Sequence, residues 1–318
     1  MTTGLITYGI TNLVATIILK KTINIAKKEG IKFEMKDIIP PEIPDEKNGA
    51  IVFKEVFTIM DEKHKEYDKL FYETCNILFS YFKDKSIKSP EEKINQTRKL
   101  LLGKEFEKFF ILVDKAVLIP ECRFKINYED GPGALLPHLA KLRGIARIYQ
   151  LKSHFIIEKG DLNSALKTFE TNFALGDCLL NEPFIISQFV RFSLYKMAMD
   201  SFQKIFYIKG EKLSEEYLKK LIFLIENKKF DIPNVYSKDR ILIGGWCYGK
   251  ILPGPFKKGH FLQGIHDAPI NEIFNKTYKI LFFPVLKLDA TFFLNNILKA
   301  KKLFSLPFYT SADKLKKT

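Results

Sequence analysis

Apolar residues recur every three to four positions along most of the chain, and runs that alternate between apolar and polar residues are few. This spacing gathers apolar side chains on one face of a helix, whereas a half-buried strand needs alternation. A proline-rich connector with prolines at 40, 41 and 44 precedes one such pattern, and Asp45 is expected to cap the helix that follows. Its apolar face would hold Ile51, Val52, Val56, Phe57 and Met60. The pattern predicts an all-α protein.

In the rest of the chain, residues that typically begin or end helices divide the apolar pattern into separate helices. A second helix is expected around 70–81, and Ser89-Pro90-Glu91-Glu92 is a capping box with proline at the first helical position. From that box to Leu118 we expect two helices with a break near Gly103. After a turn-rich segment at 127–133, further helices are expected at 135–158, 162–180 with Asp161 as its cap, 182–207, 214–227, 269–282 and 285–303.

The segment 241–266 is expected to be an irregular loop, because it contains eight glycines and prolines. Loops of this length within a compact domain are often functional. The whole pattern divides the chain into four parts. These are an N-terminal helix or membrane anchor at 1–36, a helical-hairpin domain at 37–228, a C-terminal helical extension at 229–310 and a disordered tail at 311–318.

The N-terminal run from residue 4 to 19 is uncharged and is followed by Lys20 and Lys21. It is shorter than the ~20 residues that span a bilayer, and it lacks the features of a secretory signal. Two interpretations follow: an amphipathic first helix packed on the body or a frayed terminus, or else a single membrane anchor. The first would leave the protein cytoplasmic, and the second would make it membrane-associated.

The segment 135–180 has features of a tetratricopeptide-repeat hairpin. Ser153, Gly160, Leu162, Ala165 and Phe169 match the second half of such a repeat in order and spacing. Glycine permits the tight turn, the small side chains let two antiparallel helices approach, and phenylalanine fills the space between them. A solenoid needs about three repeats, and we find one convincing unit. The sequence therefore predicts antiparallel helical hairpins around one repeat-like centre.

Three segments, at 40–50, 135–148 and 182–191, resemble an uncharacterised family of bacterial helical, tetratricopeptide-repeat-like proteins. The matching motifs are PPEIPDEKNGA, LLPHLAKLRGIARI and EPFIISQFVR. The resemblance covers about residues 24 to 309. It implies a helical fold and an N-terminal membrane-spanning segment, of which residues 4–19 would be a short, threonine-rich version, and it brings no assigned activity.

Charge and cysteine content narrow the function classes. Lys plus Arg is 51 against 37 for Asp plus Glu, a net charge of +14, but the lysines form doublets spread along the chain and arginine is scarce. Nucleic-acid proteins usually concentrate basic residues and expose aromatic ones, so an anionic membrane surface is a better partner for this charge than nucleic acid. The four cysteines form no CxxC pair, and neither a metal nor a cofactor is expected.

One motif resembles a phosphate-binding loop but lacks its essential parts. Gly244 to Lys250 fits G-x-x-x-x-G-K, yet Ile251 follows where Ser or Thr would hold magnesium, and prolines 253 and 255 oppose the required helix. An alternative function for the chain is a hydrolase-type enzyme that uses the glycine-rich loop at 241–266. Its site would consist of Cys247, His260, His266 and Asp267.

The leading candidate site is a polar cluster on a groove between the helices at 135–158 and 183–207. Its members are Tyr128, Glu129, Asp130, His138, Arg143, Ser187, Gln188 and Arg191. Arg191 could bind a carboxylate or phosphate there. The competing interpretation is that Glu129 or Asp130 pairs with Arg143 or Arg191 and pins the loop to the helices. Arg191→Ala distinguishes the two: partner capture weakens in the first, and the melting temperature falls strongly in the second.

The sequence therefore predicts a non-enzymatic helical scaffold or interaction module for a protein or peptide partner, tethered to a membrane if residues 4–19 are an anchor. The hydrolase and a charge-driven binder of anionic membranes or nucleic acid are the alternatives. The charge-driven binder would be recognised by a steep salt dependence.

Overall fold

A computed structural model describes residues 2–83, 91–228, 230–252 and 272–305. Within these ranges every regular element is helical, and Asn48 and Glu121 form one isolated parallel bridge. The all-α prediction is confirmed. The α-helices are α1 (Thr2–Lys28), α2 (Met35–Ile38), α3 (Gly49–Lys83), α4 (Glu91–Leu101), α5 (Glu107–Leu118), α6 (Pro137–Glu158), α7 (Leu162–Ala174), α8 (Ile185–Lys209), α9 (Glu215–Glu226), α10 (Ile232–Tyr248) and α12 (Glu272–Phe304).

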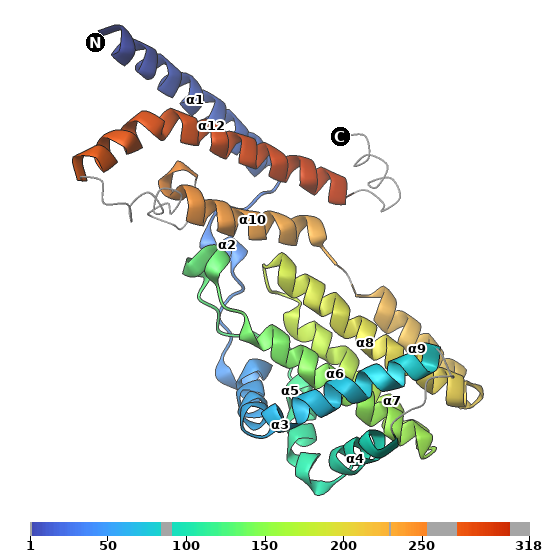
Figure 1. Cartoon of the computed structure of the whole chain (residues 1–318). Coiled ribbons are helices and arrows are strands. Elements are labelled where there is room, and N and C mark those ends of the chain that lie inside the picture. Colours follow the sequence, from blue (N-terminus) through green and yellow to red (C-terminus); the bar gives the residue numbers. More distant parts are fainter. Residues whose placement is uncertain (1, 84–90, 229, 253–271, 306–318) are drawn as a thin grey trace.

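Helices α3 to α9 form the body of the molecule around α6 (Figure 1). α6 packs against α3, α7 and α8, and it is buried on most sides. One cluster of buried residues joins α3, α5 and α6, among them Phe53, Phe109, Leu142, Ile145 and Phe155. A second joins α7, α8 and α9 through Phe169, Ala198, Ile205 and Leu221. Burying residues of this size supplies most of the driving force for folding.

An upper layer of α1, α2, α10 and α12 lies at one end of the body (Figure 1). Its own cluster includes Ile31, Phe33, Ile241, Leu242 and Leu294. A short turn at Tyr128–Gly133 packs on α10 and connects this layer to α6. The first and last helices of the described residues meet, since α1 packs along α12.

The repeat-like pair of helices folds as an antiparallel hairpin. Gly160 has a φ of 87°, and Asp161 caps α7 by accepting a hydrogen bond from the Ser164 backbone N–H at 3.0 Å. Ser153, Ala165 and Phe169 are buried between the helices. The hairpin ends earlier than predicted, because α7 stops at Ala174 and a 3-10 turn follows at Leu175–Leu179. Its membership of the tetratricopeptide class stays a prediction.

Helix ends account for several differences from the sequence prediction. Asp45 lies in a short 3-10 turn, and Asn48 caps α3 by accepting from the Ala50 N–H at 3.1 Å. The same oxygen accepts from the Arg123 N–H at 2.8 Å, which ties two distant chain segments together. α3 runs unbroken to residue 83, and the break near Gly103 is confirmed. The capping-box residues Ser89 and Pro90 lie outside the described residues.

The predicted loop at 241–266 begins as helix, so that prediction is wrong for 241–248. Glycine is tolerated in α10 because α12 lies close: a Cβ on Gly244 would overlap the Phe293 ring. α10 ends at Gly249, whose φ is 53°, and residues 253–271 lie outside the described ranges, as does the predicted tail at 311–318. Two helices were predicted for the C-terminal segment, but α12 is continuous through the buried Pro284.

Among the helices of the described residues, none combines the length and the hydropathy needed to cross a bilayer.

Candidate functional site

A buried polar network surrounds the start of α8. Glu182 lies in the connection before this helix and is only 5% exposed. Its Oε2 accepts a hydrogen bond from Ser187 Oγ at 2.5 Å. His138 Nε2 lies 2.8 Å from Glu182 Oε1, at ion-pair distance but without the alignment of a hydrogen bond. The His138 ring stacks on Phe124 with centroids 4.4 Å apart. The carboxylate thus joins the beginnings of α6 and α8.

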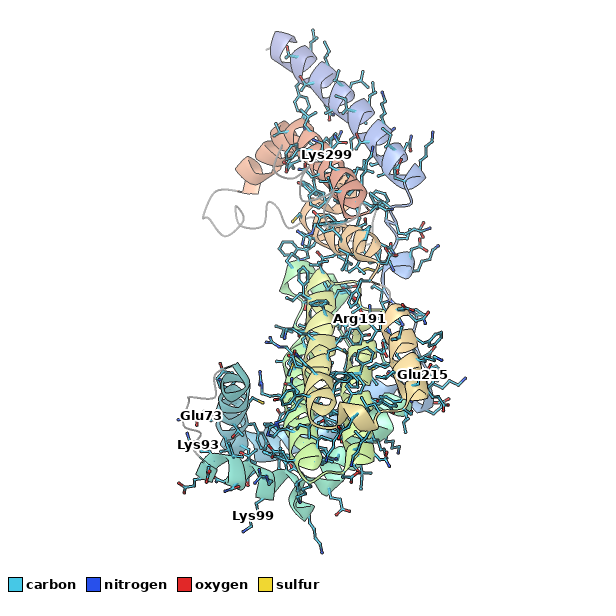
Figure 2. All side chains as sticks on the ribbon, turned by 90° about the vertical axis from the view of Figure 1, so that its right-hand side faces the viewer. Glu73, Lys93, Lys99, Arg191, Glu215 and Lys299 are labelled. Carbon is cyan, nitrogen blue, oxygen red and sulfur yellow. The ribbon has the colours of Figure 1, made fainter. Side chains whose placement is uncertain are left out.

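Gln188 and Arg191 extend the network one and two turns along α8. Gln188 Nε2 donates to the backbone oxygens of Leu179 at 2.9 Å and Glu182 at 3.1 Å. Arg191 is 2% exposed and donates from Nη1 to Gln188 Oε1 at 3.2 Å. Figure 2 labels Arg191 within the body. The side chain therefore lies inside the protein, among groups that accept its hydrogen bonds.

Tyr195 links Arg191 to a carboxylate. Arg191 Nε donates to the Tyr195 hydroxyl at 3.2 Å, and that hydroxyl donates to Asp177 Oδ1 at 2.5 Å. Lys228 donates to Asp177 Oδ2 at 2.6 Å, and the Arg191 guanidinium lies 4.5 Å from the centre of the Phe230 ring. Burial, and then the charge of Asp177, raise the pKa of Tyr195, which keeps its hydroxyl protonated as a donor.

The predicted site residues fall into two groups. His138, Ser187, Gln188 and Arg191 belong to the buried network, and Tyr128 is buried beside it, stacked on Phe184 with centroids 5.7 Å apart. Burial raises the pKa of Tyr128 to about 12. In contrast, Glu129, Asp130 and Arg143 are exposed, and Asp130 accepts from Asn127 Nδ2 at 2.9 Å.

The carboxylates of the network are Asp177 and Glu182, whereas the sequence interpretation had chosen Glu129 and Asp130. Asp177 and Glu182 follow the repeat-like hairpin, where an acidic residue in an apolar stretch indicates a buried partner. That signal was present in the segment LGDCLLNEPF and was missed.

The alternative catalytic set is described only in part. Cys247 is half-buried in α10, and burial, followed by the charge of Asp289, raises the pKa of its thiol. A nucleophilic cysteine needs a lowered pKa, so this environment opposes that role. His260, His266 and Asp267 lie outside the described residues. Within the described part of the chain, no three His, Cys, Asp or Glu side chains are grouped as metal ligands.

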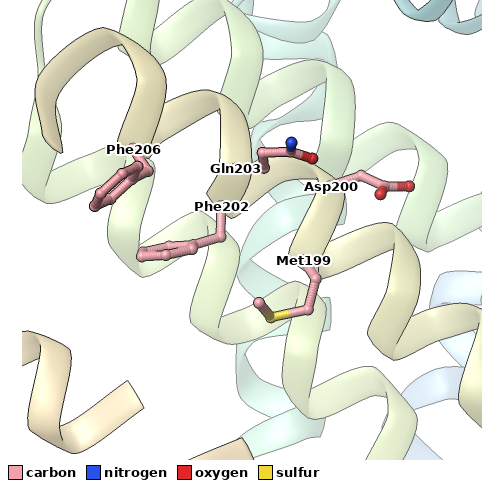
Figure 3. A pocket seen from close by; sticks show the side chains of 5 residues that line it. All are labelled: Met199, Asp200, Phe202, Gln203 and Phe206. Carbon is pink, nitrogen blue, oxygen red and sulfur yellow. The ribbon is translucent and has the colours of Figure 1, made fainter. Parts of the chain in front are cut away.

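The outer face of α8 carries large apolar side chains that point to solvent. Ile186 is 50% exposed, Phe189 59%, Phe192 61% and Phe206 51%. The far half of this face is hollowed into a pocket of about 420 Å³ (Figure 3). Its lining consists of Met199, Asp200, Phe202, Gln203 and Phe206. The spacing of apolar residues could not predict this surface, because α8 carries apolar residues on both its inner and its outer face.

A second feature that the sequence did not indicate is a lysine enclosed between α4, α6 and α8. Lys204 Nζ lies 2.7 Å from His154 Nε2 and 3.8 Å from Glu158 Oε1, and His154 Nε2 lies 2.9 Å from the same carboxylate oxygen. The side chain of Lys204 is 11% exposed. Burial, and then the nearby charge of Arg98, lower the pKa of Lys204 to about 7.

The pKa of Lys204 predicts a pH-dependent stability. In the unfolded chain this pKa is 10.5, so between about pH 7 and 10 the unfolded state binds more protons than the folded state. The contribution of Lys204 to the free energy of unfolding should therefore increase as the pH rises through this range, by up to about 1.4 kcal/mol per pH unit. Denaturant unfolding at several pH values should give a flatter profile for Lys204→Met, while the exposed Lys219→Met keeps that of the wild type. If the stability of the wild type and of Lys204→Met changes with pH in the same way, the lowered pKa of Lys204 is contradicted.

Comparisons with protein-family models, curated proteins and solved structures give no match for this chain.

Proposed function

We propose that this protein is a non-enzymatic helical scaffold that binds an amphipathic helix of a partner protein on the outer face of α8. The observation that carries the proposal is the row of exposed apolar side chains on this helix, Ile186, Phe189, Phe192 and Phe206, together with the pocket beside Met199 and Phe206. Contiguous apolar surface that is exposed in a folded chain commonly marks an interaction site.

The spacing of the row suits a helical partner. Ile186, Phe189 and Phe192 follow one another at intervals of three residues, and Met199 and Phe206 come seven apart. A helix that binds in a groove inserts anchors at similar intervals, since its own apolar residues repeat every three to four positions. The pocket beside Met199 and Phe206 would receive one apolar anchor of the partner.

The charge of the row favours an apolar partner over an anion. Lys196 and Asp200 are the charged pair on this face, and they bind each other with Nζ and Oδ2 2.8 Å apart. The face is therefore nearly neutral although the chain carries a net charge of +14. A phosphate or an anionic surface would gain little from it, whereas an uncharged helix face would gain from burial of both surfaces.

The buried network supports a scaffold because its groups bind one another. Glu182 joins the starts of two helices, and Arg191 and Gln188 hold the turn before α8. A rigid helix presents side chains to a partner with a small loss of conformational entropy on binding. In this proposal the four predicted site residues of the network, His138, Ser187, Gln188 and Arg191, hold α8 in place, and the neighbouring exposed residues make the contact.

A selected-peptide experiment tests the proposal. Amphipathic helical peptides are selected from a display library against the wild-type protein, and their affinities are then measured by fluorescence anisotropy. We expect Phe189→Asp and Phe206→Asp each to weaken the selected peptides about 30-fold, equivalent to about 2 kcal/mol. Leu118→Asp is the matched control, because Leu118 is 80% exposed on α5, away from α8.

Two results would contradict the proposed site. One is a peptide set that binds both α8 variants as tightly as the wild type while all variants keep their melting temperature. The other is an affinity that falls steeply with added salt, which would indicate binding by charge.

A further inference from the structure

The N-terminal part of α1, before the buried Leu19, presents its large apolar residues to solvent, and the helix turns small and polar residues toward α12. Ala15, Thr22 and Ala26 are buried against the neighbouring helix. The exposed side chains are Ile6 at 61%, Ile10 at 58%, Leu13 at 61%, Val14 at 47% and Ile17 at 58%. A helix that packs on a protein body in water has the opposite polarity.

Polar groups lie in the contact between the N-terminal half of α1 and α12, whereas nearer the body Leu19 and Ala26 join Leu294 in the apolar cluster of the upper layer. Lys287 of α12 donates from Nζ to Asn12 Oδ1 at 2.7 Å and to Thr16 Oγ1 at 2.8 Å. In lipid, small residues let helices approach, and polar or ionisable side chains turn toward a neighbouring helix. The α1–α12 contact has both properties, so its arrangement suits an apolar solvent on the outside.

α12 extends the apolar surface of α1, because its own exposed apolar residues lie beside those of α1. Phe283 is 40% exposed, Val285 55%, Leu288 42% and Phe292 66%. Lys287 lies among these residues in sequence and contacts α1 at residues 12 and 16, which places them beside the isoleucines. Figures 1 and 2 show the N-terminal half of α1 at the end of the molecule, away from the body.

Positive charge borders this surface. α1 contains no Asp or Glu, and its four lysines, Lys20, Lys21, Lys27 and Lys28, are exposed and follow the apolar part. α12 likewise ends with the exposed Lys299 and Lys302, and Figure 2 labels Lys299 on that helix. Lysines near a membrane surface are attracted to anionic headgroups by about 1 kcal/mol each.

From these observations we infer that the apolar half of the α1–α12 pair inserts into one leaflet of an anionic lipid bilayer, with the lysines at the headgroups. The exposed residues from Ile6 to Ile18 extend over about 18 Å of helix, at about 1.5 Å per residue. One leaflet contributes about half of a hydrocarbon core of about 30 Å. The apolar segment therefore matches the depth of a single leaflet. This inference does not depend on the α8 proposal.

Vesicle flotation with the full chain tests the inference. The protein is mixed with vesicles of phosphatidylcholine alone or of phosphatidylcholine and phosphatidylglycerol in equal parts. We expect stronger binding to the anionic vesicles, and retention of the bound protein after a wash in concentrated salt because apolar side chains are inserted. The double variant Ile10→Asp, Ile17→Asp should bind at least about tenfold more weakly, and Lys20→Gln with Lys21→Gln about 25-fold more weakly to the anionic vesicles.

Matched controls separate lipid binding from other causes. Leu118→Asp and Leu135→Asp replace leucines outside α1 and α12 that are each 80% exposed, and they should float like the wild type. Phe189→Asp should float normally as well, so failure of the α8 proposal would leave this result unchanged. Circular dichroism checks that each variant is folded.

Three outcomes would overturn the inference: equal flotation of the wild type and the double isoleucine variant, complete release by salt, or no flotation of the wild type, including a wild type that dimerises through α1. Light scattering detects the last case, in which a second copy of the chain would cover the isoleucines.

Discussion

Replacing Arg191 with alanine should lower the free energy of unfolding by about 3 kcal/mol and reduce the melting temperature by several degrees. The guanidinium is 2% exposed and donates to Gln188 and Tyr195. Its removal leaves those acceptors in a space that water fills poorly, and it takes away the cation above the Phe230 ring. Urea unfolding followed by circular dichroism measures the loss.

Arg143→Ala is the matched control for this prediction. Arg143 lies exposed on α6, and its replacement should change stability by less than about 0.5 kcal/mol. A stable Arg191→Ala protein that fails to bind its partner would instead favour the binding role that the sequence had suggested for this residue.

The second large effect is expected at Gly131, in the turn between α5 and α6. Its φ of 53° and ψ of −121° lie in a region that residues with a side chain rarely adopt, and a Cβ there would lie 2.6 Å from Trp246 Cβ. Gly131→Ala should therefore cost about 2 kcal/mol or more and push the turn away from α10. Trp246 is the single tryptophan of the chain, so its fluorescence should shift to the red as its packing is lost.

Gly133 provides the control for Gly131, since no atom lies within 4 Å of a Cβ built on it. Gly133→Ala should leave both the stability and the Trp246 emission nearly unchanged. An unchanged emission in Gly131→Ala would mean that the turn and α10 move together and tolerate the extra carbon.

The helices of the body could be predicted from sequence because local signals agree there with packing. Asp161, Gly160 and the apolar face of α6 all indicate the same hairpin, and the structure contains it. The signals failed where tertiary contact overrides local preference. Gly244 and Gly245 suggested a loop, yet they are helical because α12 approaches α10 closely at that point.

The candidate site was predictable in its residues but not in its partners. The positions of His138, Ser187, Gln188 and Arg191 were identified from spacing, and the structure brings them together around Glu182 and the turn before α8. Pairing depends on which carboxylates face inward, and this information is carried by the folded turn at 175–184 rather than by periodicity. The exposed row of α8 was missed for a similar reason, since a phenylalanine at helical spacing looks the same whether it faces the core or solvent.

The contact of α1 with α12 joins residues more than 270 positions apart, as between Lys287 and Asn12. Contacts this distant form slowly, because a long stretch of chain must be ordered first. During synthesis α1 leaves the ribosome long before α12 exists, at rates of about 5–20 residues per second. For that interval both faces of the isoleucine-rich helix are exposed to solvent, including the face with Ala15 and Ala26 that later packs on α12.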